Sequence, residues 1–260
     1  WKAEVKFLQA SYHFLLVSNY GLIPIVDEYL SIYASEQEVR LASKPVDECF
    51  RYIVETIDAA ISDLPERVLG NNDLGRIDQV IAKSIKAKVL LYSASPLFNG
   101  NSSMYSNFTN TNGDHFFNQN YENSKWDLAA KAAKEAIEAA IVQGASMYFF
   151  TETMPDYDKN NSQYEFIRNQ YDNRFAITDP WNSELLWGNS SPVTNGQYWQ
   201  IQSPAMMKDP SSSSVEAAWQ WLAPSLRMAE TYYTKNGLPI DEDLSFAYSE
   251  RHDIATIAFN

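Results

Sequence analysis

The amino-acid sequence predicts a mainly α-helical protein, with a tetratricopeptide-like scaffold of helix hairpins and an irregular, loop-rich region that contains short strands. Three observations predict this fold class. Apolar residues recur at helical spacing through most of the first 143 residues, and Gly and Pro separate these stretches. From Gly144 onward the sequence becomes rich in Asn, Ser, Tyr, Trp and Pro. With 45% hydrophobic residues among 260, the chain can fill a sizeable core.

The first predicted helix covers residues 2 to 19 and carries two apolar stripes. One stripe includes Phe7 and Phe14, and the other includes Val5 and Leu15. Two apolar stripes predict that this helix is buried on two sides. Gly21 follows and ends the helical pattern.

Two further helices are predicted from their start and stop signals. The second begins at Pro45, which suits a first helical position, and ends before Pro65. The third has Asp78 as its N-cap and ends at Ser95 and Pro96.

The fourth predicted helix is marked by a stripe of small residues. Ser124 and Asp127 resemble a capping box at its start. The stripe comprises Trp126, Ala129, Ala130, Ala133, Ile137 and Ile141. Small residues let a neighbouring helix approach closely. Four helices in two hairpin-like pairs therefore resemble tetratricopeptide stacking, although the strict repeat signature is not present.

The chain after the fourth helix is predicted to be the ligand-binding part. We divide the sequence into a helical scaffold, 1–143, and a loop-rich region packed on it, 144–260. In the second part we predict one helix, from Pro224 to about Lys235, capped by Asn236 and Gly237. Short strands are predicted at 184–187 and 198–201.

Charge and motifs exclude several functional classes. The chain has 33 acidic and 20 basic residues, a net charge of -13, which argues against nucleic-acid or anionic-membrane surfaces. The three histidines, His13, His115 and His252, are isolated, and no cofactor-binding or nucleophile motif is present, so we expect no cofactor. Cys49 is the single cysteine, which excludes an internal disulfide, and we expect it to be a buried thiol.

Several blocks in order along the chain resemble the SusD/RagB family of outer-membrane glycan-binding lipoproteins. In the first helix, Gln9 departs from the family's usual Arg, but the other matching positions are Ala3, Glu4, Phe7, Leu8, Ala10, Phe14, Leu16, Val17, Tyr20, Gly21 and Pro24. The later blocks are Asp63–Pro65, Gly75–Arg76, Leu91–Asn99, Trp126 with Ala129–Ile137, and Ala223–Ser225 with Met228, Tyr232 and Asn236–Ile240.

This resemblance implies a non-catalytic function at the surface of a Bacteroidetes cell. A SusD-like protein of the outer membrane captures oligosaccharides or polysaccharides and delivers them to a SusC-like TonB-dependent transporter. The resemblance also implies that the chain is one SusD-like domain truncated at both ends. Contact with the membrane would then be made only through an N-terminal lipid anchor that lies outside this sequence.

Aromatic residues beside amides are the candidate ligand-binding residues. Aromatic residues make up 14% of the chain, and a glycan site needs flat aromatic platforms with polar groups that pair the sugar hydroxyls. The candidates are Trp181, Asn182, Tyr198, Trp199, Trp219, Gln220 and Trp221. If residues 219–221 are extended, a spacing of two turns both indoles to the same face.

Other readings of the sequence stay open. Asp156 and Asp158 copy the first ligands of a calcium loop, but Asn161 and Ile167 replace the glycine and glutamate of an EF-hand. A loop calcium site that uses Asp156 and Asp158, or Asp241 and Asp243, is therefore only a weak alternative to a solvated acidic turn. An all-α glycoside-processing enzyme would need two carboxylates about 5 to 9.5 Å apart, a spacing that the sequence does not reveal. A helical-repeat adaptor that binds peptides would explain the four helices equally well.

Overall fold

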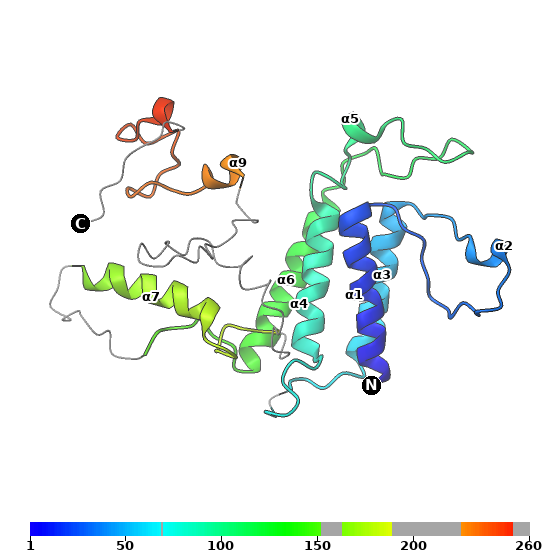
Figure 1. Cartoon of the computed structure of the whole chain (residues 1–260), viewed down its shortest axis with the longest axis horizontal. Helices are drawn as coiled ribbons and strands as arrows, with labels where there is room; N and C mark the ends of the chain where they lie inside the picture. Colours follow the sequence, from blue (N-terminus) through cyan, green and yellow to red (C-terminus); the bar gives the residue numbers. More distant parts are fainter. Residues whose placement is uncertain (69, 152–162, 189–224, 252–260) are drawn as a thin grey trace, which may run out of the picture. The chain divides into compact units, whose positions relative to one another are not determined.

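The computed structural model describes residues 1–68, 70–151, 163–188 and 225–251 (Figure 1). The chain forms two compact units, Trp1–Ser190 and Ser191–Asn260. The predicted mainly α-helical class is confirmed: the described residues form helices and loops, with isolated bridges rather than strands. Residues 144–190, which the sequence grouped with the later chain, belong to the first unit.

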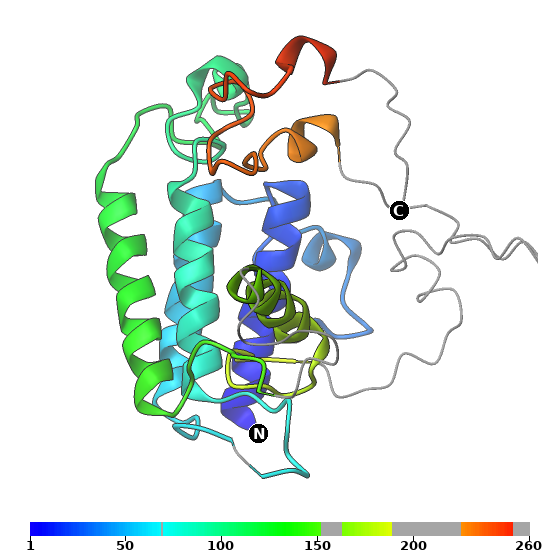
Figure 2. The same ribbon diagram turned by 90° about the vertical axis from the view of Figure 1, so that its left-hand side faces the viewer.

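Four long helices form the scaffold of the first unit. They are α1 (Lys2–Tyr20), α3 (Val46–Ile61), α4 (Gln79–Ala94) and α6 (Ser124–Val142). They lie side by side and alternate in direction, with α3 packed on α1 and α4, and α4 packed on α6 (Figures 1 and 2). The four helices therefore form the helix hairpins that the periodicity predicts.

The core lies between these helices. Phe7 from α1 and Ile53 and Ile57 from α3 have no exposed surface, and Val89 of α4 is equally buried. The α4–α6 contact is made by a different set of small residues from the predicted stripe: the buried residues of α6 are Ala129, Ala132, Ala136 and Ala140, and of these only Ala129 was predicted. Small side chains let the two helix backbones come close, as predicted. Ile137 and Ile141 were assigned to the predicted stripe but are exposed.

Two local predictions for the scaffold are wrong. Ser124 is the first helical residue of α6, and the N-cap is Asn123, which makes no side-chain capping bond. The predicted capping box therefore does not form. The second stripe of α1 is exposed at Val5 and Leu15, because no described element packs on that side of the helix.

Asp78 is the N-cap of α4, as predicted, and it is buried. Its Oδ1 accepts a hydrogen bond from the Ile81 N–H at 2.9 Å. Its Oδ2 accepts bonds from Arg67 Nη1 at 3.1 Å and from the Val68 N–H at 3.2 Å. The carboxylate thus joins the α3–α4 connection to the start of α4.

Buried Asn99 joins the end of α4 to the segment before α6. Its Nδ2 donates to the Ala94 and Glu122 carbonyls at 3.3 and 2.9 Å, and its Oδ1 accepts from the Glu122 N–H at 2.8 Å. Gly100 follows with φ 74°, and a Cβ there would lie 2.5 Å from the Tyr121 nitrogen. The close approach of the two segments therefore requires glycine. The connections also contain the short helices α2 (Glu36–Val39) and α5 (Ser102–Tyr105).

Residues 163–188 depart from the prediction. Helix α7 (Tyr164–Thr178) was not predicted, because it has no buried residue and hence no apolar stripe. The strand predicted at 184–187 is wrong: these residues form turns and irregular backbone. A strand needs a neighbouring strand to pair with, and none is described here.

In the second unit, the predicted helix from Pro224 to Lys235 is largely wrong. Helix α9 covers only Leu226–Ala229 and is capped by Ser225, whose Oγ accepts from the Met228 N–H at 3.2 Å. Asn236 and Gly237 lie in a turn closed by the Gly237 N–H to the Thr234 carbonyl at 2.9 Å. A short 3₁₀-helix, η1 (Tyr248–Glu250), follows.

Candidate functional site

Two of the seven predicted ligand-binding residues, Trp181 and Asn182, lie in the described chain, in the turn after α7. The others, Tyr198, Trp199, Trp219, Gln220 and Trp221, lie outside the described residues, as do the metal candidates Asp156 and Asp158 and the predicted strand at 198–201.

Trp181 adopts an unusual backbone conformation. With φ 54°, it is the one non-glycine residue with positive φ in the described part of the chain. A left-handed conformation costs a bulky residue about 1 to 2 kcal/mol, and such strain is concentrated at functional sites. The ring is half-buried beside Gly188, and the indole N–H donates to no group among the described residues. Trp181 therefore offers a partly exposed ring and an available donor.

Asn182 holds the turn that carries Trp181. Its Nδ2 donates to the carbonyls of Ala176 and Asp179, both at 2.9 Å. Its Oδ1 accepts from the Glu184 and Leu185 N–H groups at 2.9 and 3.3 Å. The amide is bonded at both ends within the turn, so it positions its neighbour.

Trp187 ties the same segment to the scaffold. Its Nε1 donates to the Gly75 carbonyl at 3.1 Å, and its ring meets Phe7 edge-on, with centroids 5.9 Å apart. Arg67 Nη1, already bonded to Asp78, also donates to the Leu186 carbonyl at 3.2 Å. Trp187 therefore packs on the scaffold with one side of its ring, while 40% of the residue stays exposed.

An aromatic cluster lies next to this turn and was not foreseen. Phe150 stacks on Phe175 of α7 with centroids 4.6 Å apart, and Tyr171 packs against both rings. The Phe150 N–H donates to Asp172 Oδ1 at 2.7 Å. The i, i+4 spacing of Tyr171 and Phe175 is the sequence signal that could have indicated the cluster.

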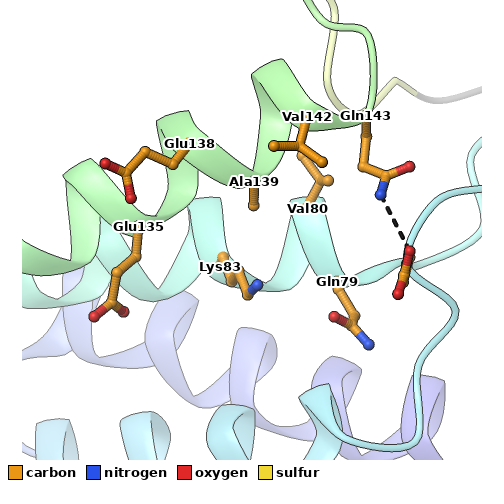
Figure 3. Close-up of a pocket in the computed structure, with 9 residues that line it drawn as sticks. Gln79, Val80, Lys83, Glu135, Glu138, Ala139, Val142 and Gln143 are labelled. Atoms are coloured by element: carbon orange, nitrogen blue, oxygen red, sulfur yellow. Dashed lines mark hydrogen bonds between the residues drawn. The ribbon is translucent and has the colours of Figure 1, made fainter.

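A pocket of about 450 Å³ lies between α4 and α6 (Figure 3). Lys83 projects from α4, and Glu135 and Glu138 project from α6. Gln143 Nε2 donates to Glu66 Oε2 at 3.2 Å at one end. Both α6 glutamates are exposed, so the pocket has no desolvated carboxylic acid of the kind a glycosidase uses.

A larger apolar groove, of about 660 Å³, runs along α6 on another side. Ala133, Ile137 and Ile141 of α6 line it together with Met147 and Leu186. The two isoleucines missing from the α4 contact are thus part of this groove. The groove has few polar groups that could form hydrogen bonds with the hydroxyls of a sugar.

A third pocket lies within residues 225–251 and was missed by the sequence analysis. It has a volume of about 270 Å³, and its walls include Tyr232, Tyr233, Phe246, Glu230 and Arg251. The density of Tyr and Phe between 232 and 248 was the available signal.

The turn beside this pocket is organised by buried Asp243. Its Oδ1 accepts from the Ser245 N–H at 2.9 Å and the Ser245 hydroxyl at 2.7 Å. Its Oδ2 accepts from the Thr234 hydroxyl and from Asn236 Nδ2, the latter at 2.9 Å. These hydrogen bonds, led by those from Thr234 and Ser245, hold the pKa of Asp243 far below its usual range.

Metal-binding clusters and membrane-spanning helices are both absent from the described residues. Residues 1–68, 70–151, 163–188 and 225–251 contain no group of three His, Cys, Asp or Glu side chains placed to hold a metal ion. None of the helices in these ranges is both long and apolar enough to span a bilayer.

A similar architecture is found among solved structures. No family model and no curated protein matches the sequence. Among solved structures, the protein BT4246 aligns at 31% identity over 95% of this chain with a TM-score of 0.76, and its selenomethionine form aligns at 30% with 0.73. A SusD-like protein of Bacteroides fragilis aligns at 20% identity over 56% of this chain and 21% of its own, with a TM-score of 0.39.

The chain thus shares its helix-hairpin fold with BT4246. It covers 43% of BT4246, so it spans less than half the length of that relative. The chain belongs to the SusD-like family, as the ordered sequence blocks predict.

Proposed function

We propose that this chain is part of a non-catalytic, cell-surface protein that binds oligosaccharides or polysaccharides. Membership of the SusD-like family carries the proposal.

The proposed ligand platform consists of aromatic residues that follow residue 144. Its aromatic members are Trp181, Tyr198, Trp199, Trp219 and Trp221, and the amide of Gln220 lies between the last two in the sequence. Trp181 supports this assignment because its ring is partly exposed, its N–H is available, and Asn182 fixes its turn. Sugar C–H faces stack on such rings while the indole N–H pairs a hydroxyl.

The test is calorimetry and intrinsic tryptophan fluorescence of the 260-residue chain with oligosaccharides of glucose, mannose and xylose. We expect saturable binding without product formation, weakened about tenfold or more in Trp181→Ala and in the double variant Trp219→Ala/Trp221→Ala. Trp1→Ala removes an indole that is 85% exposed and lies outside the proposed platform, so it is the matched control.

The outcomes separate the alternatives. Product release would make the chain an enzyme, and unchanged affinity in the platform variants would move the site elsewhere. Failure of the wild-type chain to bind any of the sugars would contradict glycan binding by this part of the protein.

We further propose delivery of the glycan to a SusC-like TonB-dependent transporter at the outer membrane. This step is supported by the family assignment alone. Protease treatment of intact cells should cleave the protein if it is surface-exposed. Co-isolation of a TonB-dependent transporter with the tagged protein would support the partnership, and its absence after mild detergent extraction would count against it.

A further inference from the structure

The aromatic side chains around the pocket in residues 225–251 do not form a core within that range. Tyr232 and Tyr233 line it and are 68% and 70% exposed. Asp243 is the one buried residue in this range, so the aromatic side chains here do not make a core. Large aromatic side chains that gather around a hollow without being buried are characteristic of a binding surface.

The polar wall of the pocket is fixed in place. Arg251 Nε donates to Glu230 Oε1 at 2.9 Å, and Nη1 donates to the Tyr248 carbonyl at 2.9 Å. The guanidinium also lies 3.9 Å from the centroid of the Tyr248 ring. These contacts hold the guanidinium in one orientation, while its Nη2 donates to none of the described residues.

Such a wall matches the hydroxyl groups of a sugar. The guanidinium of Arg251 offers donors and the carboxylate of Glu230 is an acceptor, and each sugar hydroxyl can both donate and accept. The two charges are paired with each other, so a neutral ring is favoured over an anionic one. A volume of about 270 Å³ lies just below the range of about 300 to 1,000 Å³ typical of small-molecule sites, so it suits one ring.

The pocket is also supported by a rigid turn. Thr234 lines it, and the Thr234 hydroxyl is bonded to the Asp243 carboxylate. A binding surface that is ordered before the ligand arrives loses less entropy on binding. The same hydrogen bonds that hold the turn therefore favour recognition.

We propose that Tyr232, Tyr233 and Arg251 form a second sugar-binding subsite, which takes one neutral hexose of an oligosaccharide and is separate from Trp181. The tyrosine rings stack on the sugar, and Arg251 with Glu230 pairs adjacent hydroxyls. This inference rests on the proposed glycan-binding function and adds a site to it.

The test compares tyrosine pairs in the 260-residue chain, with the oligosaccharide that binds the wild type best. We expect Tyr232→Ala/Tyr233→Ala to weaken binding about tenfold in calorimetry. The control, Tyr29→Ala/Tyr33→Ala, removes two tyrosines that are 85% and 89% exposed in the α1–α3 connection, and should leave affinity unchanged. Arg251→Lys keeps the charge but loses the forked donors, and should also weaken binding.

Each result decides between the two sites. Wild-type affinity in both the Tyr232/Tyr233 and the Arg251 variants, with weakened binding in Trp181→Ala, would overturn the subsite and leave the proposed function standing. No binding by the wild-type chain would overturn both. Tighter binding of uronic-acid oligosaccharides than of neutral ones would contradict the assignment of a neutral hexose. The Ser245 amide resonance should be unchanged in the variants, which would show that the turn is intact.

Discussion

The helical scaffold and residues 225–251 are held together by different forces. The scaffold buries apolar side chains from four helices, among them Phe7, Ile53 and Ile57, which are fully excluded from solvent. Residues 225–251 bury one residue, the carboxylate Asp243, which accepts four hydrogen bonds from a turn of its own sequence.

This difference separates fold from recognition. Apolar burial is the dominant favourable term in folding. In the scaffold this stabilisation is distributed over many residues, so other apolar side chains on the same helices can remain exposed. A polar turn stabilises only a few neighbouring residues but leaves its aromatic side chains at the surface. Aromatic rings are available for ligands where they are not needed for a core.

The largest effect that would support this comparison is expected for Phe7→Ala. The ring is fully buried and also contacts Trp187, so its loss removes apolar burial and leaves a cavity. We expect the free energy of unfolding to fall by about 4 kcal/mol. Urea denaturation followed by circular dichroism measures this change. A loss of less than about 1 kcal/mol would show that the core is not close-packed at this position.

A slightly smaller loss is expected when the polar centre of the scaffold is removed by Asp78→Ala. The change deletes the N-cap of α4 and leaves Arg67 without its carboxylate partner. We expect about 3 kcal/mol less stability, since breaking a mostly buried ion pair costs about 3 to 5 kcal/mol and Arg67 keeps some solvent contact. Glu36→Ala is the control: it breaks an exposed ion pair with Arg40 and should cost about 0.5 kcal/mol or less.

In residues 225–251 the expected effect is local and depends on pH. Because the folded pKa of Asp243 is lowered, the unfolded turn binds more protons on acidification. The stabilisation is therefore fully present above the ordinary carboxyl pKa of about 3.9 and is lost as the pH falls through the lower folded value. The Ser245 amide resonance reports this transition directly, since this amide donates to Asp243.

Asp243→Asn should remove that acid transition and open the turn at neutral pH, while the helical circular dichroism of the scaffold stays unchanged. Asp241→Asn changes a neighbouring exposed carboxylate and should preserve the transition. Loss of scaffold helicity in the Asp243 variant would contradict the expectation that the turn stabilises only a few neighbouring residues.

Prediction from sequence succeeded where burial produces a repeating pattern. Residues at helical spacing located α1, α3, α4 and α6, and Asp78 was recognised as a cap because its side chain bonds a local N–H. Helix α7 was missed because none of its residues is buried, so its sequence carries no apolar stripe along one face. The order of the sequence blocks indicated the family independently of these local errors.

The candidate site was less predictable, for a physical reason. A Trp-Asn pair looks the same in the sequence whether the amide forms hydrogen bonds with a ligand or with the backbone of its own turn. In this protein, Asn182 is bonded to the backbone of its turn. The pocket with Tyr232 depends on a turn that Asp243 organises through residues several positions away. Contacts of this kind follow from tertiary geometry, and periodicity does not encode them.

The smallest expected change in stability concerns the segment after α7, which Trp187 joins to the scaffold. Trp187→Phe keeps an aromatic ring against Phe7 but removes the N–H that donates to the Gly75 carbonyl. We expect a loss of about 1 kcal/mol in urea denaturation, the usual net value of one hydrogen bond. Trp181→Phe removes an N–H that has no partner in the described part of the chain, so the stability of this variant should stay within about 0.5 kcal/mol of the wild type.

The effects of the same two variants on ligand affinity should have the opposite order to their effects on stability. If Trp181 contacts a sugar, Trp181→Phe weakens binding because a hydroxyl loses its donor, whereas Trp187→Phe leaves affinity close to that of the wild type. Equal stability losses in the two variants would mean that the Trp181 indole is also a structural group. The measured contrast would then separate the tryptophan that fastens this segment to the scaffold from the one that its turn presents to solvent.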